Sequence, residues 1–149
     1  MAQSVVWRGL DEPRMEIAHI ERAGAEPRAR GTQIGLVYEL RYELEPGLLT
    51  AEVVGGERRE FRLDGDFFDL GNSPLFNSLP VWRDGVGDTR DYVMTWISVP
   101  ELEVSRSEQR YEPLGDGRLR YRSGSFSAEL ELDDDGVVTR YPGLAERVA

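Results

Sequence analysis

The 149-residue sequence contains no cysteine, no lysine and a single histidine, His19. The lack of cysteine excludes disulfide bonds, thiolate metal sites and cysteine nucleophiles. One imidazole cannot form a zinc site by itself. No window approaches the ~20 apolar residues of a membrane-spanning helix, and residues 1–14 lack the basic and apolar regions of a signal peptide. We therefore expect a cytoplasmic protein with no membrane insertion.

The second scarcity is positive charge. The chain has 28 acidic residues against 18 arginines and a formal net charge of −10. Nucleic acids and anionic membranes recruit basic patches, so neither is expected as a partner. A chain of this length buries enough surface for one core, and we expect a single domain over residues 1–149. Nothing in the composition indicates a cofactor.

Most of the chain alternates apolar and polar residues with a period of two, which is typical of half-buried strands. In residues 37–44, Leu40 and Tyr42 share one face, and Arg41 and Glu43 share the other. Strands are predicted at residues 5–10, 14–23, 31–36, 37–44, 49–54, 60–63, 92–99, 102–105, 110–114, 118–122, 125–132 and 137–141. Hairpin turn signals separate them and no long helical pattern intervenes. This predicts one antiparallel, mainly β domain.

Residues 63–83, LDGDFFDLGNSPLFNSLPVWR, break the alternation. Ser73 and Pro74 predict the start of a helix, with Ser73 as its cap and Pro74 at its first position. Pro80 is expected to end it. Its apolar face would hold Leu75, Phe76 and Leu79, and its polar face Asn77 and Ser78. So short a helix cannot recover its nucleation cost in water, and we expect the sheet to hold it.

The lone histidine and the acidic clusters each allow a chemical and a structural interpretation. His19 lies in phase with Met15 and Ile17, an apolar pattern that predicts an inward side chain. It could act as a general base, but no nucleophile accompanies it, which favours a structural role. Asp64 and Asp66 would share one face of a strand close to Asp69. Paired carboxylates can hydrolyse glycosides, although acidic strand ends are usually solvated.

The run at 133–136, Asp-Asp-Asp-Gly, imitates the start of an EF-hand loop. The twelfth position of such a loop would be Pro142 rather than glutamate, and no helices flank the run. We predict a solvated turn there and no metal site.

Aromatic residues gather in the middle of the chain. They are Phe67, Phe68, Phe76, Trp82, Tyr92, Trp96 and Tyr111. Such residues mostly build the core. The alternative is the wall of a ligand cavity, since sugar rings stack on indoles and acyl chains fill apolar clefts.

Three stretches resemble the putative glycolipid-binding family, a group of small single-domain bacterial proteins. They are residues 63–83 with the Ser-Pro-led helix, residues 92–114 (YVMTWISVPELEVSRSEQRYEPL) and residues 126–148 (FSAELELDDDGVVTRYPGLAERV). The resemblance implies a spiral β-roll, in which a long antiparallel sheet wraps around one short central α-helix, and a homodimer. The sequence departs from the family pattern at residues 81–83, where a more basic motif is expected.

The leading hypothesis is a non-enzymatic binding or carrier protein for a glycolipid or other amphiphile. Acyl chain would contact Phe67, Phe68, Leu75 and Phe76, and the polar head would meet Asn77, Trp82 and Arg83. A second hypothesis is a hydrolase of a carbohydrate or lipid head group that uses Asp64, Asp66 or His19. A third is a structural or interaction protein without a ligand, which a cavity below ~300 Å³ would favour.

Overall fold

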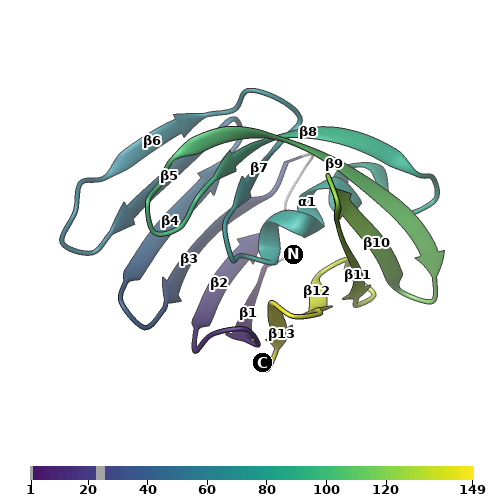
Figure 1. Cartoon of the computed structure of the whole chain (residues 1–149), viewed down its shortest axis with the longest axis horizontal. Helices are drawn as coiled ribbons and strands as arrows, with labels where there is room; N and C mark the ends of the chain where they lie inside the picture. The colour runs from purple at the N-terminus through teal and green to yellow at the C-terminus, as the bar shows by residue number, and fades with distance from the viewer. Residues whose placement is uncertain (1, 23–25) are drawn as a thin grey trace.

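The computed structural model describes residues 2–22 and 26–149, among which there are thirteen strands and one helix (Figure 1). The strands are β1 (Ala2–Gly9), β2 (Met15–Glu21), β3 (Arg28–Ile34), β4 (Glu39–Glu45), β5 (Leu48–Val53), β6 (Arg59–Arg62), β7 (Phe67–Leu70), β8 (Arg90–Ile97), β9 (Val104–Gly115), β10 (Arg118–Ser123), β11 (Phe126–Leu132), β12 (Val138–Tyr141) and β13 (Ala145–Arg147). The helix is α1 (Leu75–Asp84).

All thirteen strands form one sheet, in the order β6-β5-β4-β3-β2-β1-β13-β12-β11-β10-β9-β8-β7. Every neighbouring pair is antiparallel except β7 and β8, which are parallel. Figure 1 shows the sheet curving around α1, which lies in its concave interior. The predicted fold class, a mainly β roll around one short helix, is confirmed.

The period-two pattern correctly predicts which residues share a face of a strand. On β2, however, it does not show which of the two faces points into the roll. On β4 the alternating Leu40, Tyr42 and Leu44 are buried, as predicted. On β2 the buried residues are Glu16, Ala18 and Ile20. Met15 and Ile17 are therefore exposed, and the prediction that His19 points inward is wrong.

A mixed strand such as β2 has apolar residues on both faces, so its pattern alone cannot choose between them. The structure resolves the choice because Glu16 finds hydrogen-bond partners inside the roll. The last residue of the predicted strand 14–23 lies outside the described residues.

Three strands have no single counterpart in the prediction. The predicted segments 102–105 and 110–114 are joined in one long strand, β9, because the polar residues between them pair with β8 along its whole length. The short strands β7 and β13 were not predicted. Strand β7 lies within the segment that was interpreted as a break in the alternation, and β13 has only three residues.

Helix α1 begins and ends at different residues from those predicted. Pro74 takes the cap position, and Ser73 makes no capping bond; its hydroxyl instead donates to Glu16 Oε2 at 2.6 Å. Pro80 lies inside the helix, which continues to Asp84 and closes at Gly85, whose φ of 73° suits a glycine. The proline removes one helical hydrogen bond. Burial of the side chains around it offsets that loss.

The polar face predicted for α1 is buried as well. Asn77 and Ser78 are 3% and 0% exposed, because the sheet encloses the helix on that side too. Ser78 Oγ accepts a hydrogen bond from the backbone N–H of Val138 at 3.2 Å. Asn77 Nδ2 donates to the hydroxyl of Tyr111 at 3.1 Å. A helix in this position needs a partner for each polar side chain.

Truncation of Phe76 tests how much of the fold depends on α1. Its side chain is 1% exposed, and its ring lies 5.7 Å from that of Tyr42. We expect Phe76→Ala to lower the free energy of unfolding by about 3–5 kcal/mol, measured by urea denaturation. Val37→Ala, at a side chain that is 90% exposed, should change it by less than about 0.5 kcal/mol. Equal effects of the two variants would contradict a core centred on α1.

Candidate functional site

Strand β7 and helix α1 border two hollows in the roll. The first, which we call the apolar hollow, has a volume of about 130 Å³. Phe67 and Phe68 on β7 and Leu79 on α1 line one side of it. Leu44 and Leu63 also line it, together with the acidic Glu26, Glu45 and Asp66. Aliphatic and aromatic walls of this kind suit hydrocarbon.

Arg83 lies at the edge of the apolar hollow. Its guanidinium carbon is 4.5 Å from the ring centroid of Phe67 and 5.8 Å from that of Tyr92. Its Nη2 is 3.0 Å from Asp84 Oδ2, and the hydrogen bonds to Asp84 raise the pKa of Arg83. The side chain is half exposed, so a cation stands beside the apolar walls and remains in contact with water.

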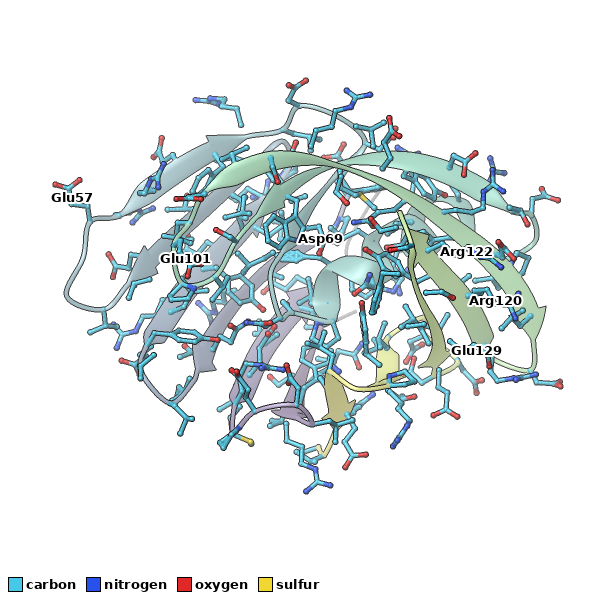
Figure 2. The ribbon with its side chains drawn as sticks, in the orientation of Figure 1. Glu57, Asp69, Glu101, Arg120, Arg122 and Glu129 are labelled. Atoms are coloured by element: carbon cyan, nitrogen blue, oxygen red, sulfur yellow. The ribbon has the colours of Figure 1, made fainter. Side chains whose placement is uncertain are left out.

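The second hollow, the polar hollow, has a volume of about 320 Å³. Asp69 at the end of β7 and Asn77 on α1 line it, together with three aromatic side chains from other strands. These aromatics are Trp96, Tyr121 and Tyr141. Figure 2 shows Asp69 inside the roll beside α1, and Glu101, which also lines this hollow, on the connection between β8 and β9.

A chain of hydrogen bonds fixes one oxygen of Asp69. Gln109 Nε2 donates to Asp69 Oδ2 at 2.7 Å, and the hydroxyl of Tyr111 donates to Gln109 Oε1 at 3.2 Å. Asn77 in turn donates to Tyr111. Asp69 Oδ1 accepts no hydrogen bond from the described residues, yet part of this atom remains accessible to solvent. This oxygen therefore remains open to a donor in the hollow.

Burial raises the pKa of Asp69 from 3.8 to about 6, and the hydrogen bond from Gln109 opposes the rise. The residue is 9% exposed. Transfer of a carboxylate out of water penalises its charged form. Asp69 is thus a buried acid that is largely ionised at neutral pH and protonated below about pH 6.

A second buried carboxylate, Glu16 on β2, lies beside Ser73, just before the start of α1. Its Oε2 accepts from the hydroxyls of Tyr42 at 2.7 Å and Ser73 at 2.6 Å, and its Oε1 accepts from Gln33 Nε2 at 3.1 Å. Burial raises the pKa of Glu16, and these hydrogen bonds oppose the rise. Both of its oxygens accept hydrogen bonds from other side chains, so Glu16 joins the start of α1 to the sheet.

The structure brings together three of the residues predicted to bind ligand. Phe67, Phe68 and Arg83 line the apolar hollow. Asn77 lines the polar hollow and so lies apart from them. That these side chains contact a ligand stays a prediction.

The remaining three predicted residues line neither hollow. Leu75 and Phe76 are each 1% exposed and belong to the core around α1. Trp82 is half-buried, and its Nε1 donates to the backbone oxygen of Asp135 at 2.8 Å. This contact fastens the end of α1 to the turn between β11 and β12.

The polar residues of the hydrolase hypothesis are dispersed. Asp64 and Asp66 lie on the connection before β7, where Asp66 Oδ2 accepts from the backbone N–H of Val93 at 2.8 Å. His19 lies on the outer face of β2, with Nδ1 3.2 Å from Ser4 Oγ. None of these three residues lines the polar hollow, and Asp66 lines the apolar hollow instead.

The acidic run at 133–136 forms the predicted turn. Asp133 Oδ1 accepts from the backbone N–H groups of Asp135 and Val137, both at 2.9 Å. Asp133 Oδ2 pairs with Arg147 at 2.8 Å. In the part of the chain that the structure describes, no group of three or more acidic or histidine residues could hold a metal ion.

Several residues that line the hollows were not predicted as site residues. Leu79 was predicted on the apolar face of the helix, and Tyr121 lies two residues from Leu119 on β10, where both side chains are buried. Tyr141 and Glu101 carried no such signal. They reach the hollow through the curvature of the sheet, which the local sequence does not encode.

The fold and its interior hollows define a class of protein: a β-roll wrapped around one helix with room beside it. Residues 52–147 match the family described as "Putative glycolipid-binding", and the chain belongs to this family. It is also similar to the crystal structure of a DUF1089 family protein from Pseudomonas aeruginosa, with a TM-score of 0.60 and 21% sequence identity. That alignment covers 99% of this chain and 92% of the other. The similarity shows that the two proteins share a fold. No curated protein matches the sequence.

Asp69 gives the protein a pH-dependent stability. Between about pH 4 and pH 6 the folded protein keeps a proton on Asp69 that the unfolded chain has lost, so stability falls as pH rises through this window. The difference between the two pKa values corresponds to about 3 kcal/mol. Asp69→Asn cannot titrate. We expect the difference in free energy of unfolding between wild type and this variant to change by about that amount from about pH 4 to pH 7, measured by urea denaturation. A constant difference would contradict the raised pKa.

Proposed function

We propose that this protein is a non-enzymatic binding protein for a glycolipid or related amphiphile, whose sugar or polar head occupies the polar hollow. The observation that carries the proposal is Asp69, a buried carboxylate with one oxygen fixed by Gln109 and the other open to the hollow. An acceptor that can be reached from the hollow gains a hydrogen bond when a ligand supplies the donor.

The walls of the polar hollow support a carbohydrate ligand. Its volume of about 320 Å³ lies within the range of small-molecule sites, which begins near ~300 Å³. Sugar hydroxyls can donate to Asp69 Oδ1, and a hydrogen bond to an ionised acceptor is roughly twice as strong as a neutral one. Tyr121, Tyr141 and Trp96 offer apolar ring surface beside it.

The apolar hollow would hold part of an acyl chain. At about 130 Å³ it is smaller than a complete ligand site. Its size alone would favour a protein without a ligand, so the proposal rests on the polar hollow. Phe67, Phe68 and Leu79 would contact the hydrocarbon, and Arg83 at the edge could pair with an anionic group.

The finer expectations belong to the same proposal. They are that the protein acts as a carrier, that it is a homodimer as the family resemblance implies, and that it works in the cytoplasm of a bacterium. Among the described residues no helix is long and apolar enough to cross a membrane. Light scattering would test the homodimer, for which we expect twice the chain mass of 16.9 kDa.

A hydrolase of a carbohydrate head group is the second candidate, and one observation favours it. Asp69, with a pKa of about 6, and Glu101 both line the polar hollow. A carboxylic acid of this pKa suits general acid catalysis near neutral pH. Turnover of chromogenic glycosides that disappears in Asp69→Asn would support this candidate over simple binding.

An alkyl glycoside below its micellar concentration tests the proposed binding by calorimetric titration. Loss of a charge-assisted hydrogen bond weakens binding by roughly 1.5–3 kcal/mol, so we expect Asp69→Asn to raise Kd by about 10- to 100-fold. Asp134→Asn removes the same charge at an exposed turn position and should leave Kd unchanged. Wild-type binding should strengthen from about pH 5 to pH 7, as Asp69 ionises.

Two results would count against the proposal. The first is no binding of alkyl glycosides at micromolar protein, together with no lipid found by mass spectrometry of extracts of the purified protein. The second is equal affinity of wild type and Asp69→Asn, which would place the sugar elsewhere.

A further inference from the structure

One end of the sheet carries a group of exposed aliphatic side chains, which we call the aliphatic rim. Its members are Met15, Ile17, Ile34, Leu36, Val37 and Val54, all between 40% and 90% exposed. The most exposed are Leu36 at 73% and Val37 at 90%, in the turn between β3 and β4. Single exposed aliphatics are ordinary, whereas a contiguous group marks an interaction surface.

The strand register places the aliphatic rim on neighbouring strands, with one acidic residue, Glu39, between Ile34 and Val54. Met15 pairs directly with Ile34 across β2 and β3, and Ile34 pairs with Glu39 across β3 and β4. The backbone N–H of Val54 donates to the oxygen of Glu39 at 2.8 Å. The rim thus runs across the ends of four neighbouring strands, β2 to β5, with the Leu36–Val37 turn at its tip.

The aliphatic rim lies at the same end of the roll as the polar hollow. Tyr38, which follows the exposed turn, donates its hydroxyl to Gln33 Oε1 at 2.5 Å. Gln33 Nε2 donates to the backbone oxygen of Gly71 at 3.2 Å. Gly71 and Asn72 line the polar hollow. The apolar hollow is bordered by the turn between β4 and β5, at the other end of these strands.

We infer that the aliphatic rim docks the protein on the surface of an electrically neutral lipid bilayer. Aliphatic side chains at the tip of a turn can enter the boundary between head groups and acyl chains. Glu39, which pairs with Ile34, and the net charge of −10 oppose an anionic surface. The inference rests on the proposed function: the docked protein would take up the amphiphile from the bilayer, with the head group entering the polar hollow.

The charges beside the aliphatic rim argue against a second copy of the chain as its occupant. A stable dimer buries about 800 Å² on each partner, or 20–30 residues a side. Further along the same outer face, Arg30 pairs with Glu43 across β3 and β4, and Thr32 pairs with Arg41. The aliphatic rim has six side chains, far fewer than the about 20–30 residues that such an interface uses on each side.

Flotation with phosphatidylcholine vesicles tests the inference. We expect wild type to float with these vesicles, and less so when about a third of the lipid is phosphatidylglycerol. Leu36→Ser with Val37→Ser removes the two most exposed side chains and should weaken vesicle binding at least tenfold, because burial of one such side chain contributes about 1.5–3 kcal/mol. Val86→Ser, at a 44% exposed site on the α1–β8 connection, is the matched control and should float like wild type.

Three flotation results would overturn the inference. They are no flotation of wild type with phosphatidylcholine, equal flotation of the double variant, and stronger binding to the anionic vesicles. A lower native mass of the double variant by light scattering would also overturn it, because the aliphatic rim would then join copies of the chain. Titration of the double variant with a soluble alkyl glycoside separates the two proposals. If its affinity equals that of wild type, the proposed binding in the polar hollow stands, whether or not the protein floats with vesicles.

Discussion

The enclosure of one helix by a single sheet is the constraint on which the rest of this structure depends. A surface helix can present its polar residues to water, but α1 cannot, because residues 75–80 are buried on every side. Each polar group of the helix must therefore find a partner on the sheet. Ser78 bonds β12 and Asn77 bonds Tyr111 on β9. The position of the helix in the roll follows as much from these bonds as from apolar packing.

The same constraint explains why two carboxylates lie inside the roll and why they differ. A buried charge is tolerated only when it is paired or well hydrogen-bonded. Glu16 meets that condition with three donors, and it connects β2 to the start of α1. Asp69 meets it only in part, because Gln109 serves one oxygen. The first arrangement is structural, and the second leaves an acceptor in a hollow of ligand size.

Much of the fold could be predicted from the sequence, because alternation on strands such as β4 and β10 records which residues share a face. Alternation does not say which face is inside, and on β2 the polar Glu16 is buried while Ile17 is exposed. The helix was predicted from Ser73 and Pro74, but its limits were wrong. Tertiary hydrogen bonding redirected Ser73, and burial allowed the helix to pass through Pro80.

The candidate site was less accessible to sequence reasoning than the fold. The apolar hollow follows from neighbouring residues of β7 and α1, so Phe67, Phe68 and Arg83 were found together. The polar hollow assembles Asp69 with Tyr121 and Tyr141, which lie more than fifty residues further along the chain. Only the curvature of the sheet brings them together.

The central claim is that the open oxygen of Asp69 receives the polar head of an amphiphile. A crystal structure of the protein with a bound alkyl glycoside tests it most directly. The account predicts sugar density in the polar hollow, with a hydroxyl within hydrogen-bond distance of Asp69 Oδ1 and a ring against Tyr121 or Tyr141. Ordered sugar at any other place, with the polar hollow holding only water, would contradict it.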